Sequence, residues 1–331
     1  MFRDKDRFRP DPDDFVIVIM GPTGSGKSNV SVFVVPLTSN YQVKNDQFIN
    51  KLTGNTERHK ASNLKSDTQD VTPYPISYQG LRVVLVDTPG FDDTYRQDSD
   101  ILRVIADWLI KKYPDGTPLK IAGIIYVHRI TDNRMSGSAY RNLQMFGRLC
   151  GSVPLPRTRL ITTMWDQSKD QAAGMRRETQ LKDDFWRALI QGGARAHKFH
   201  NTAESAQEIV GSLLRMGNIE DGEELLLQEE LIEQQKRLNE TEAGKMIYNR
   251  LQKLLADQRK MLKDLAEEAK QQNNPDLVKS LRSECDKVDA QLQRTFEDIK
   301  EMKIPLSRRI LLWLFGRKSR AKVVELDFAQ A

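Results

Sequence analysis

Short apolar runs alternate with amphipathic segments through the first two thirds of the chain. The run at 15–20 (FVIVIM) is apolar throughout, which is typical of a strand buried on both faces of a sheet. Further strands are predicted at 71–77, 81–87, 121–127, 159–163 and 198–201. Helices are predicted at 28–37, 98–111, 138–150, 175–191 and 204–216. This alternation predicts an α/β fold with a doubly wound, mostly parallel sheet and helices on both faces.

The pattern changes near residue 217, where the chain becomes rich in Glu, Gln, Lys and Leu. Two series of positions follow a 4-3 spacing and predict a long helical hairpin or coiled coil over 218–303, interrupted at 271–276 (QQNNPD). The first series is Ile247, Leu251, Leu254, Gln258, Met261 and Leu265, and the second is Leu281, Cys285, Val288, Leu292, Thr295, Ile299 and Met302. Two interpretations stay open: the seams pack within the chain, or they bind a partner.

The two ends of the chain are polar or basic. Residues 1–14 carry no apolar core of a secretory signal and are expected to form a disordered lead-in before a sheet domain at 15–217. Residues 304–331 form a basic amphipathic tail, in which the apolar stretch 310–315 is too short to span a bilayer. The stretch can dock on the folded domain, or 304–322 can lie on an anionic membrane surface.

Composition adds little beyond this. The formal net charge of +5 is concentrated near the C-terminus, so we expect no nucleic-acid partner. The two cysteines are far apart and show no metal-ligand spacing. A reduced, cytoplasmic compartment is expected, with peripheral attachment to a membrane through the tail as an addition.

The most specific motif is GPTGSGKS at 21–28, which follows a predicted strand and opens a predicted helix. It matches the P-loop, in which glycines let backbone N–H groups face a polyphosphate. Lys27 is expected to reach the β- and γ-phosphates, and Ser28 to hold Mg²⁺. The residues assigned to phosphate binding are Gly21, Thr23, Gly24, Ser25, Gly26, Lys27, Ser28 and Asn29.

A second motif, DTPG at 87–90, ends another apolar strand. Asp87 is placed to hold Mg²⁺ through water, and Gly90 to offer its backbone N–H to a γ-phosphate. A threonine is expected to complete the metal shell from the polar stretch before 71. Thr68 is the choice, with Thr72 and Ser66 as alternatives.

A third candidate is TTMWD at 162–166, where a predicted strand ends on an acidic residue. Asp166 can accept hydrogen bonds from N1–H and the exocyclic amine of guanine, a donor pair that adenine lacks. GTPases usually carry [NT]-K-x-D here, and this chain has Met164 where the lysine is usual. Trp165 can shield the base or pack under the next helix. Asn201, in FHNTAES, is the candidate for a further base contact, and Thr202 or Ser205 for a helix cap.

GPTGSGKS, DTPGFDDT, YVHRITDNR and TTMWD together resemble the branch of GTPases that holds the septins, the Toc-type import receptors and the immunity-associated GTPases. The nearest resemblance is to fungal G-domain P-loop proteins, over roughly 15–265. It implies binding of GTP and GDP with Mg²⁺ and a nucleotide-dependent homodimer. Phe91 stands where Ras-like enzymes have a water-orienting Gln, so slow hydrolysis is expected. The resemblance implies that Arg129 acts as an arginine finger across the dimer; an ion pair with Asp132 or Asp92 is the alternative.

Three functions fit these motifs. The first is a slow GTPase that works as a dimerising switch or scaffold. The second is a catalytically weak pseudo-GTPase whose C-terminal helices are an interaction module. The third, a nucleotide-driven kinase, would need a phosphate-acceptor site, and the sequence shows none.

Overall fold

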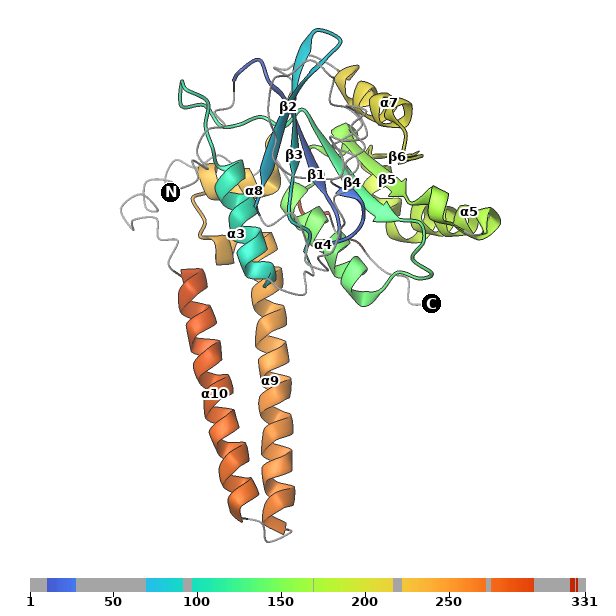
Figure 1. The fold of residues 1–331 in the computed structure, drawn as a ribbon. Coiled ribbons are helices and arrows are strands. Elements are labelled where there is room, and N and C mark those ends of the chain that lie inside the picture. The colour runs from blue at the N-terminus through green and yellow to red at the C-terminus, as the bar shows by residue number, and fades with distance from the viewer. Residues whose placement is uncertain are drawn as a thin grey trace, which may run out of the picture. The chain divides into compact units, whose positions relative to one another are not determined.

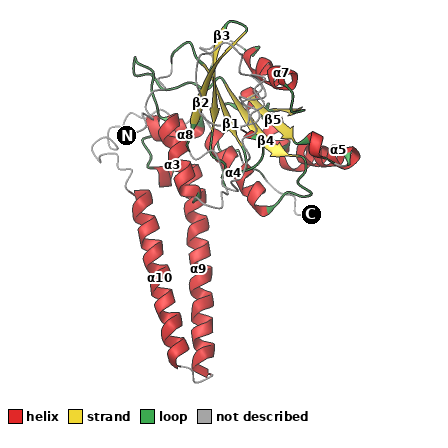
Figure 2. Cartoon of the chain, in the orientation of Figure 1, coloured by secondary structure: helices red, strands yellow, loops and turns green. Residues whose placement is uncertain are grey.

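The structure, a computed structural model, describes residues 11–27, 70–91, 97–168, 170–216, 222–271, 275–300, 322–324 and 326. The chain forms two compact units. One comprises residues 1–232 together with 318–331, and the other comprises residues 233–317. The first unit contains the sheet and the second contains two long helices (Figure 1 and Figure 2).

Six strands form the sheet, in the order β2-β3-β1-β4-β5-β6. They are β1 (Phe15–Met20), β2 (Thr72–Tyr78), β3 (Leu81–Asp87), β4 (Gly123–Arg129), β5 (Thr158–Thr163) and β6 (Arg195–Lys198). β2 runs antiparallel to β3, and the other pairings are parallel. The predicted α/β fold with a doubly wound, mostly parallel sheet is confirmed.

Helices and single turns connect the strands and extend beyond them. In the sheet unit they are α3 (Asp98–Leu109), α4 (Gly137–Cys150), η1 (Leu155–Arg157), η2 (Trp165–Gln167), α5 (Gln171–Gln180), η3 (Leu181–Phe185), α6 (Arg187–Gln191), α7 (Ala203–Leu214), α8 (Leu226–Gln228) and the start of η5 (Glu229–Glu233). The hairpin unit holds η6 (Leu238–Glu240), α9 (Glu242–Gln271) and α10 (Pro275–Lys300).

The central strands are buried on both faces, as their continuous apolar runs predict. Side chains alternate along a strand, so Ile125 and Val127 of β4 join one core cluster with Ile209 and Leu213 of α7. Tyr126 points the other way, where its ring meets Phe146 of α4. Helices α7 and α4 therefore cover opposite faces of the sheet.

Four strands, β2, β4, β5 and β6, begin one to three residues away from the positions that the sequence predicts. β4 runs two residues further than 127, because His128 and Arg129 continue the ladder beside Thr162 and Thr163 of β5. Ile121 instead forms an isolated bridge with Glu223. The strand predicted at 198–201 is β6 at Arg195–Lys198, whose polar residues Arg195 and His197 concealed it.

The segment predicted as one helix at 175–191 consists of α5, the π-helical turn η3 and α6. α5 begins earlier, at Gln171, because the Asp170 carboxylate accepts a hydrogen bond from the backbone N–H of Ala173 and caps the first turn. The helix predicted at 28–37 and the polar stretch 38–69 lie outside the described residues, as does the basic stretch 304–321. Within the described part of the chain, no helix is long and apolar enough to cross a membrane.

Two later segments belong to the sheet unit. The Gln228 side-chain amide donates hydrogen bonds to the carbonyls of Leu109 and Leu119, which holds α8 against the end of α3. The two units therefore divide at 232, later in the chain than the change of composition near 217. Near the C-terminus the chain returns to α4, where the Ser152 N–H donates to the Lys322 carbonyl at 2.9 Å and the Tyr140 hydroxyl to the Leu326 carbonyl at 2.8 Å.

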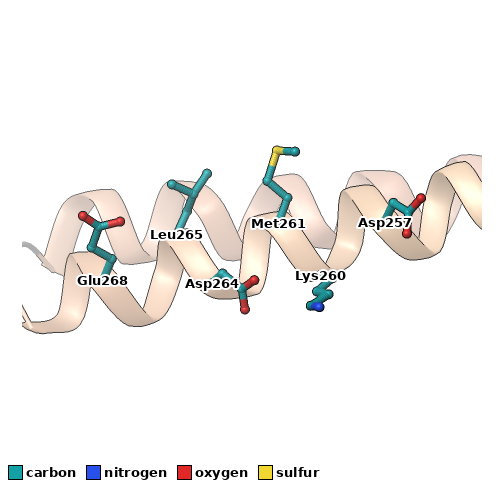
Figure 3. A pocket seen from close by; sticks show the side chains of 6 residues that line it. All are labelled: Asp257, Lys260, Met261, Asp264, Leu265 and Glu268. Atoms are coloured by element: carbon teal, nitrogen blue, oxygen red, sulfur yellow. The ribbon is translucent and has the colours of Figure 1, made fainter.

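In the hairpin unit, α9 and α10 pack against each other. The buried positions of α9 near its C-terminal end are Ala266 and Ala269. Leu254, Met261 and Leu265 are 54%, 64% and 43% exposed, and Figure 3 shows Met261 and Leu265 on the same side of α9. The two faces are roughly a quarter turn apart at 3.6 residues per turn. These three positions of the first predicted seam are therefore exposed, and the buried face of α9 lies beside them.

Candidate functional site

The loop after β1 is shaped by its glycines. Gly21, Gly24 and Gly26 have φ of 147°, 74° and 88°, which L-residues with a side chain rarely adopt. A Cβ on Gly21 would lie 2.4 Å from the Val127 carbonyl oxygen, so no larger residue fits there. Lys27 is buried, and its ammonium donates to the Pro22 carbonyl at 3.0 Å, across the mouth of the loop. This is a cradle of backbone and one cation that suits a polyphosphate.

The DTPG segment lies directly against this loop. Asp87 ends β3 beside Ile19 of β1 and is buried. The Thr88 hydroxyl donates to the Ile19 carbonyl at 2.8 Å, and the Thr23 hydroxyl to the Gly90 carbonyl at 3.2 Å. Parallel strands β1 and β3 therefore bring the two motifs together at their carboxyl ends, where ligands bind in sheets of this kind.

The end of β5 joins the same edge. The Thr163 hydroxyl donates to the Ser25 carbonyl at 2.7 Å and so ties β5 to the P-loop. A small cavity opens beside this contact. Its lining residues are Gly26, Thr163, Met164, Asp166, Gln167, Phe199 and Asn201. The structure thus brings three of the predicted residues, Gly26, Asp166 and Asn201, around one cavity.

Asp166 and Asn201 are hydrogen-bonded to each other. The Asn201 amide donates to Oδ2 of Asp166 at 3.4 Å. Asn201 has a φ of 57°, in the left-handed region that asparagine tolerates better than most residues. Thr202 caps α7 by accepting from the Ser205 N–H, so the capping alternative applies to Thr202 and leaves Asn201 for the cavity.

Trp165 packs beneath α5. It is buried, its indole N–H donates to the Thr162 hydroxyl at 3.0 Å, and its ring lies against Gly174. The Lys198 ammonium lies 4.6 Å from the ring centroid. These contacts favour the packing interpretation of Trp165 over the base-shielding one. Met164, in contrast, lines the cavity in a left-handed conformation with a φ of 62°.

Arg129 ends β4 next to the P-loop. Its Nη1 lies 3.4 Å from the position that a Cβ on Gly24 would take, and its Nε pairs with Asp132 at 3.0 Å. The predicted ion pair and the predicted closeness to the phosphate site are thus both present. His128 beside it is buried edge-on to Trp186, and burial lowers the pKa of its imidazole to about 4. His128 is therefore neutral at physiological pH.

Some predicted residues cannot be placed. Ser28, Asn29, Thr68 and the alternative Ser66 lie outside the described residues. Thr72 opens β2 opposite Asp87, and its hydroxyl donates to the Asp70 carbonyl at 3.2 Å. Within the described ranges, no group of three or more His, Cys, Asp or Glu side chains could hold a metal ion. Asp87 is the described member of the proposed Mg²⁺ site.

Three lining residues were not predicted from the sequence. Thr163 and Gln167 flank Asp166 closely enough in sequence that a strand end beside a P-loop could have indicated them. Phe199 looks like an ordinary core residue in the sequence, and it is buried while it closes the cavity.

Comparison with known proteins gives a partial family match. A family profile described as 50S ribosome-binding GTPase matches residues 47–119, a range that contains β2, β3 and α3. No curated protein matches the chain. The profile therefore covers the DTPG segment and leaves the P-loop and the Asp166 cavity to be judged from the structure.

Several solved structures are similar to part of this chain at low sequence identity. A dimerisation-deficient mutant of Toc33 from Arabidopsis thaliana is 12% identical, with 62% of this chain and 86% of that chain covered and a TM-score of 0.44. Toc33 with Mg²⁺ and GMPPNP is 13% identical, with the same coverage and a TM-score of 0.41. The G domain of the T. maritima FeoB iron transporter is 12% identical over 61% of this chain and 98% of that one, with a TM-score of 0.33. The family match covers 47–119, and the described residues before 217 form a mostly parallel six-stranded sheet with the P-loop cradle at one edge.

Proposed function

We propose that this chain binds GTP and GDP with Mg²⁺ and hydrolyses GTP slowly. The observation that carries the proposal is the cavity beside the P-loop, where Gly26, Asp166 and Asn201 meet. Gly26 belongs to the P-loop, which supplies the phosphate cradle, and the Asp166 carboxylate, which can accept two N–H donors, lines the same cavity. A guanine nucleotide requires both kinds of group.

Mg²⁺ is part of the proposal. Asp87, Ser28 and Thr68 would hold it, and the ion would supply positive charge that neutralises the phosphates. Burial of Asp87 beside the P-loop suits this role, because a buried carboxylate gains from a cation. Lys27 binds and orients the phosphates from the other side of the loop.

Slow hydrolysis follows from the DTPG segment. Phe91 is buried and apolar, so it cannot orient a water molecule by hydrogen bonding. Arg129 is the candidate for stabilising charge in the transition state. Its guanidinium lies against the P-loop of its own chain, so we propose that it acts within one protomer once Asp132 releases it. Action across a dimer, which the resemblance implies, is the alternative.

The finer identity and the partners belong to this proposal as well. The resemblance to the septin, Toc-type and immunity-associated branch supports a nucleotide-dependent homodimer. A second candidate function is a weak or inactive GTPase that works as an interaction module. The exposed Leu254, Met261 and Leu265 of α9 favour it. A cytoplasmic location, with 304–322 on an anionic membrane surface, is also proposed, and co-sedimentation of the full chain with phosphatidylserine vesicles tests the surface contact.

One titration tests the central proposal. The full chain is titrated with GDP, GMPPNP, ADP and AMPPNP, with Mg²⁺ and then with EDTA, and its mass is followed by light scattering. We expect guanine nucleotides to bind at least ~10-fold more tightly than adenine nucleotides. Lys27→Ala should weaken the binding of every nucleotide, because it removes the cation that is expected to contact the phosphates. Equal or tighter binding of adenine nucleotides would contradict the guanine assignment, and an unchanged mass with GMPPNP would contradict the dimer.

A further inference from the structure

Thr23 links the two phosphate-binding motifs through one side chain. Its hydroxyl donates to the carbonyl of Gly90 at 3.2 Å, across 67 positions of sequence. Thr23 stands at the third position of GPTGSGKS, where the P-loop pattern leaves the residue type open. The P-loop therefore does not need a hydroxyl there to cradle phosphates.

Gly90 is packed tightly onto the P-loop. A Cβ on Gly90 would lie 2.5 Å from the backbone N of Thr23, 2.7 Å from its hydroxyl and 2.9 Å from Nζ of Lys27. Each distance is shorter than a carbon atom tolerates, so only glycine fits. The backbone of Gly90 thus lies against the Thr23 amide and near the Lys27 ammonium, which is expected to reach the γ-phosphate.

In this contact Gly90 presents a hydrogen-bond acceptor, and not a donor, to the P-loop. A γ-phosphate needs hydrogen-bond donors and cations around it. Gly90 instead directs its carbonyl oxygen, a partial negative charge, toward the P-loop, where Thr23 holds it. A third phosphate would have to displace the Gly90 carbonyl from Thr23 before the Gly90 N–H could bind it. The α- and β-phosphates, which the loop itself cradles, make no such demand.

We infer that Thr23 sets the preference of this site between diphosphate and triphosphate nucleotides, by holding the DTPG segment closed through the Gly90 carbonyl. The inference rests on the proposed binding of GTP and GDP. Only the triphosphate loses the Thr23–Gly90 hydrogen bond on binding. A neutral hydrogen bond contributes on the order of 1 kcal/mol net, so the bond shifts the ratio of the two affinities by roughly 3- to 10-fold toward GDP.

The test compares two variants of the full chain. Thr23→Val keeps the shape of the side chain and removes the donor, whereas Thr23→Ser keeps the donor. The dissociation constants for GDP and GMPPNP are measured with Mg²⁺ by calorimetry. Thr23→Val should bind GMPPNP roughly 3- to 10-fold more tightly relative to GDP than the wild type does, and Thr23→Ser should keep the wild-type ratio. Thr23→Ala, also without a hydroxyl, should shift the ratio in the same direction and replaces Thr23→Val if that variant does not fold.

The outcomes separate this inference from the proposed function. If the wild type binds both guanine nucleotides and neither hydroxyl-free variant changes the ratio, the role of Thr23 is overturned while the proposed function stands. A ratio that moves toward GDP in Thr23→Val would overturn it too, because the hydroxyl would then favour the triphosphate. If the wild type binds neither GDP nor GMPPNP, the proposed function fails first and the inference falls with it.

Discussion

The amide of Asn201 donates a hydrogen bond to Oδ2 of Asp166, so the loop after β6 and the end of β5 meet at one carboxylate. This contact engages Oδ2 and orients the carboxylate beside the cavity that Gly26 also lines. Asn201 is thus placed to hold Asp166 in one orientation for the base.

We predict that Asp166→Asn changes the base preference of the site from guanine to xanthine. The asparagine amide would face the exocyclic amine of guanine with a second donor, and it would match the carbonyl that xanthine carries at the same position. Affinity for GDP should fall by about 10²-fold, and xanthosine diphosphate should bind more tightly than GDP. Calorimetric titration of both nucleotides measures this.

Asp183→Asn is the matched control, because Asp183 is an exposed carboxylate on the π-helical turn after α5. It should leave both affinities unchanged. If Asp166→Asn keeps its preference for GDP over xanthosine diphosphate, Asp166 does not read the base.

For Arg129 we predict action within one chain. Arg129→Ala should lower single-turnover GTP hydrolysis by about 10³-fold if the residue stabilises transition-state charge as arginine fingers do. Mixing Arg129→Ala with Lys27→Ala should restore no activity, since neither chain has a complete site. Recovery of turnover in the mixture would show instead that Arg129 of one protomer serves the site of the other.

The stability of the sheet unit should fall as pH drops from 6.5 toward 4. Burial lowers the pKa of His128 in the folded protein to about 4, against 6.5 for an ordinary histidine. Between these values the unfolded chain binds a proton that the folded chain does not, so unfolding becomes easier with acid. The contribution of neutral, buried His128 to the free energy of unfolding is fully present above pH 6.5. Urea unfolding at pH 7.5 and pH 5 measures the loss.

A variant separates His128 from other groups. Burial also lowers the pKa of His197, in the same direction. His128→Asn should therefore reduce the difference in unfolding free energy between pH 7.5 and pH 5 without abolishing it. A variant with the full wild-type difference would mean that His128 titrates normally.

The two faces of α9 should respond differently to charge. Met261→Glu places a carboxylate on a side chain that is already 64% exposed, so the thermal midpoint should change by less than ~2 °C. Ala269→Glu places a charge at a buried position of α9 and should cost several kcal/mol. Circular dichroism melting of the full chain compares them. Equal destabilisation by both variants would show that Met261 is covered in solution.

Much of the fold could be predicted because its strands are continuous apolar runs. Phe15–Met20 and Leu81–Asp87 carry their motifs at their ends, so the P-loop and DTPG were placed together on chemical grounds. β6 was predicted at the wrong residues because Arg195 and His197 give it no apolar pattern. Its position is set by its pairing with β5.

The remaining differences between prediction and structure concern the direction in which a side chain points, which a sequence pattern does not contain. Nothing in TTMWD says whether Trp165 turns toward the base or toward α5; the Thr162 hydroxyl and Gly174 decide it. In α9 the spacing of Met261 and Leu265 indicates a shared face correctly. The buried face includes Ala266 and Ala269, small residues that carry a weak apolar signal in the sequence.

The return of the chain to α4, where Ser152 and Tyr140 bind the backbone of Lys322 and Leu326, makes the hairpin an insertion rather than an appendage. The polypeptide leaves the sheet unit after residue 232 and comes back to it at 318. A segment that begins and ends on the same scaffold can be shortened, exchanged or acquired during evolution while the scaffold keeps its own contacts. The sheet unit and the hairpin unit are therefore separable by a single excision.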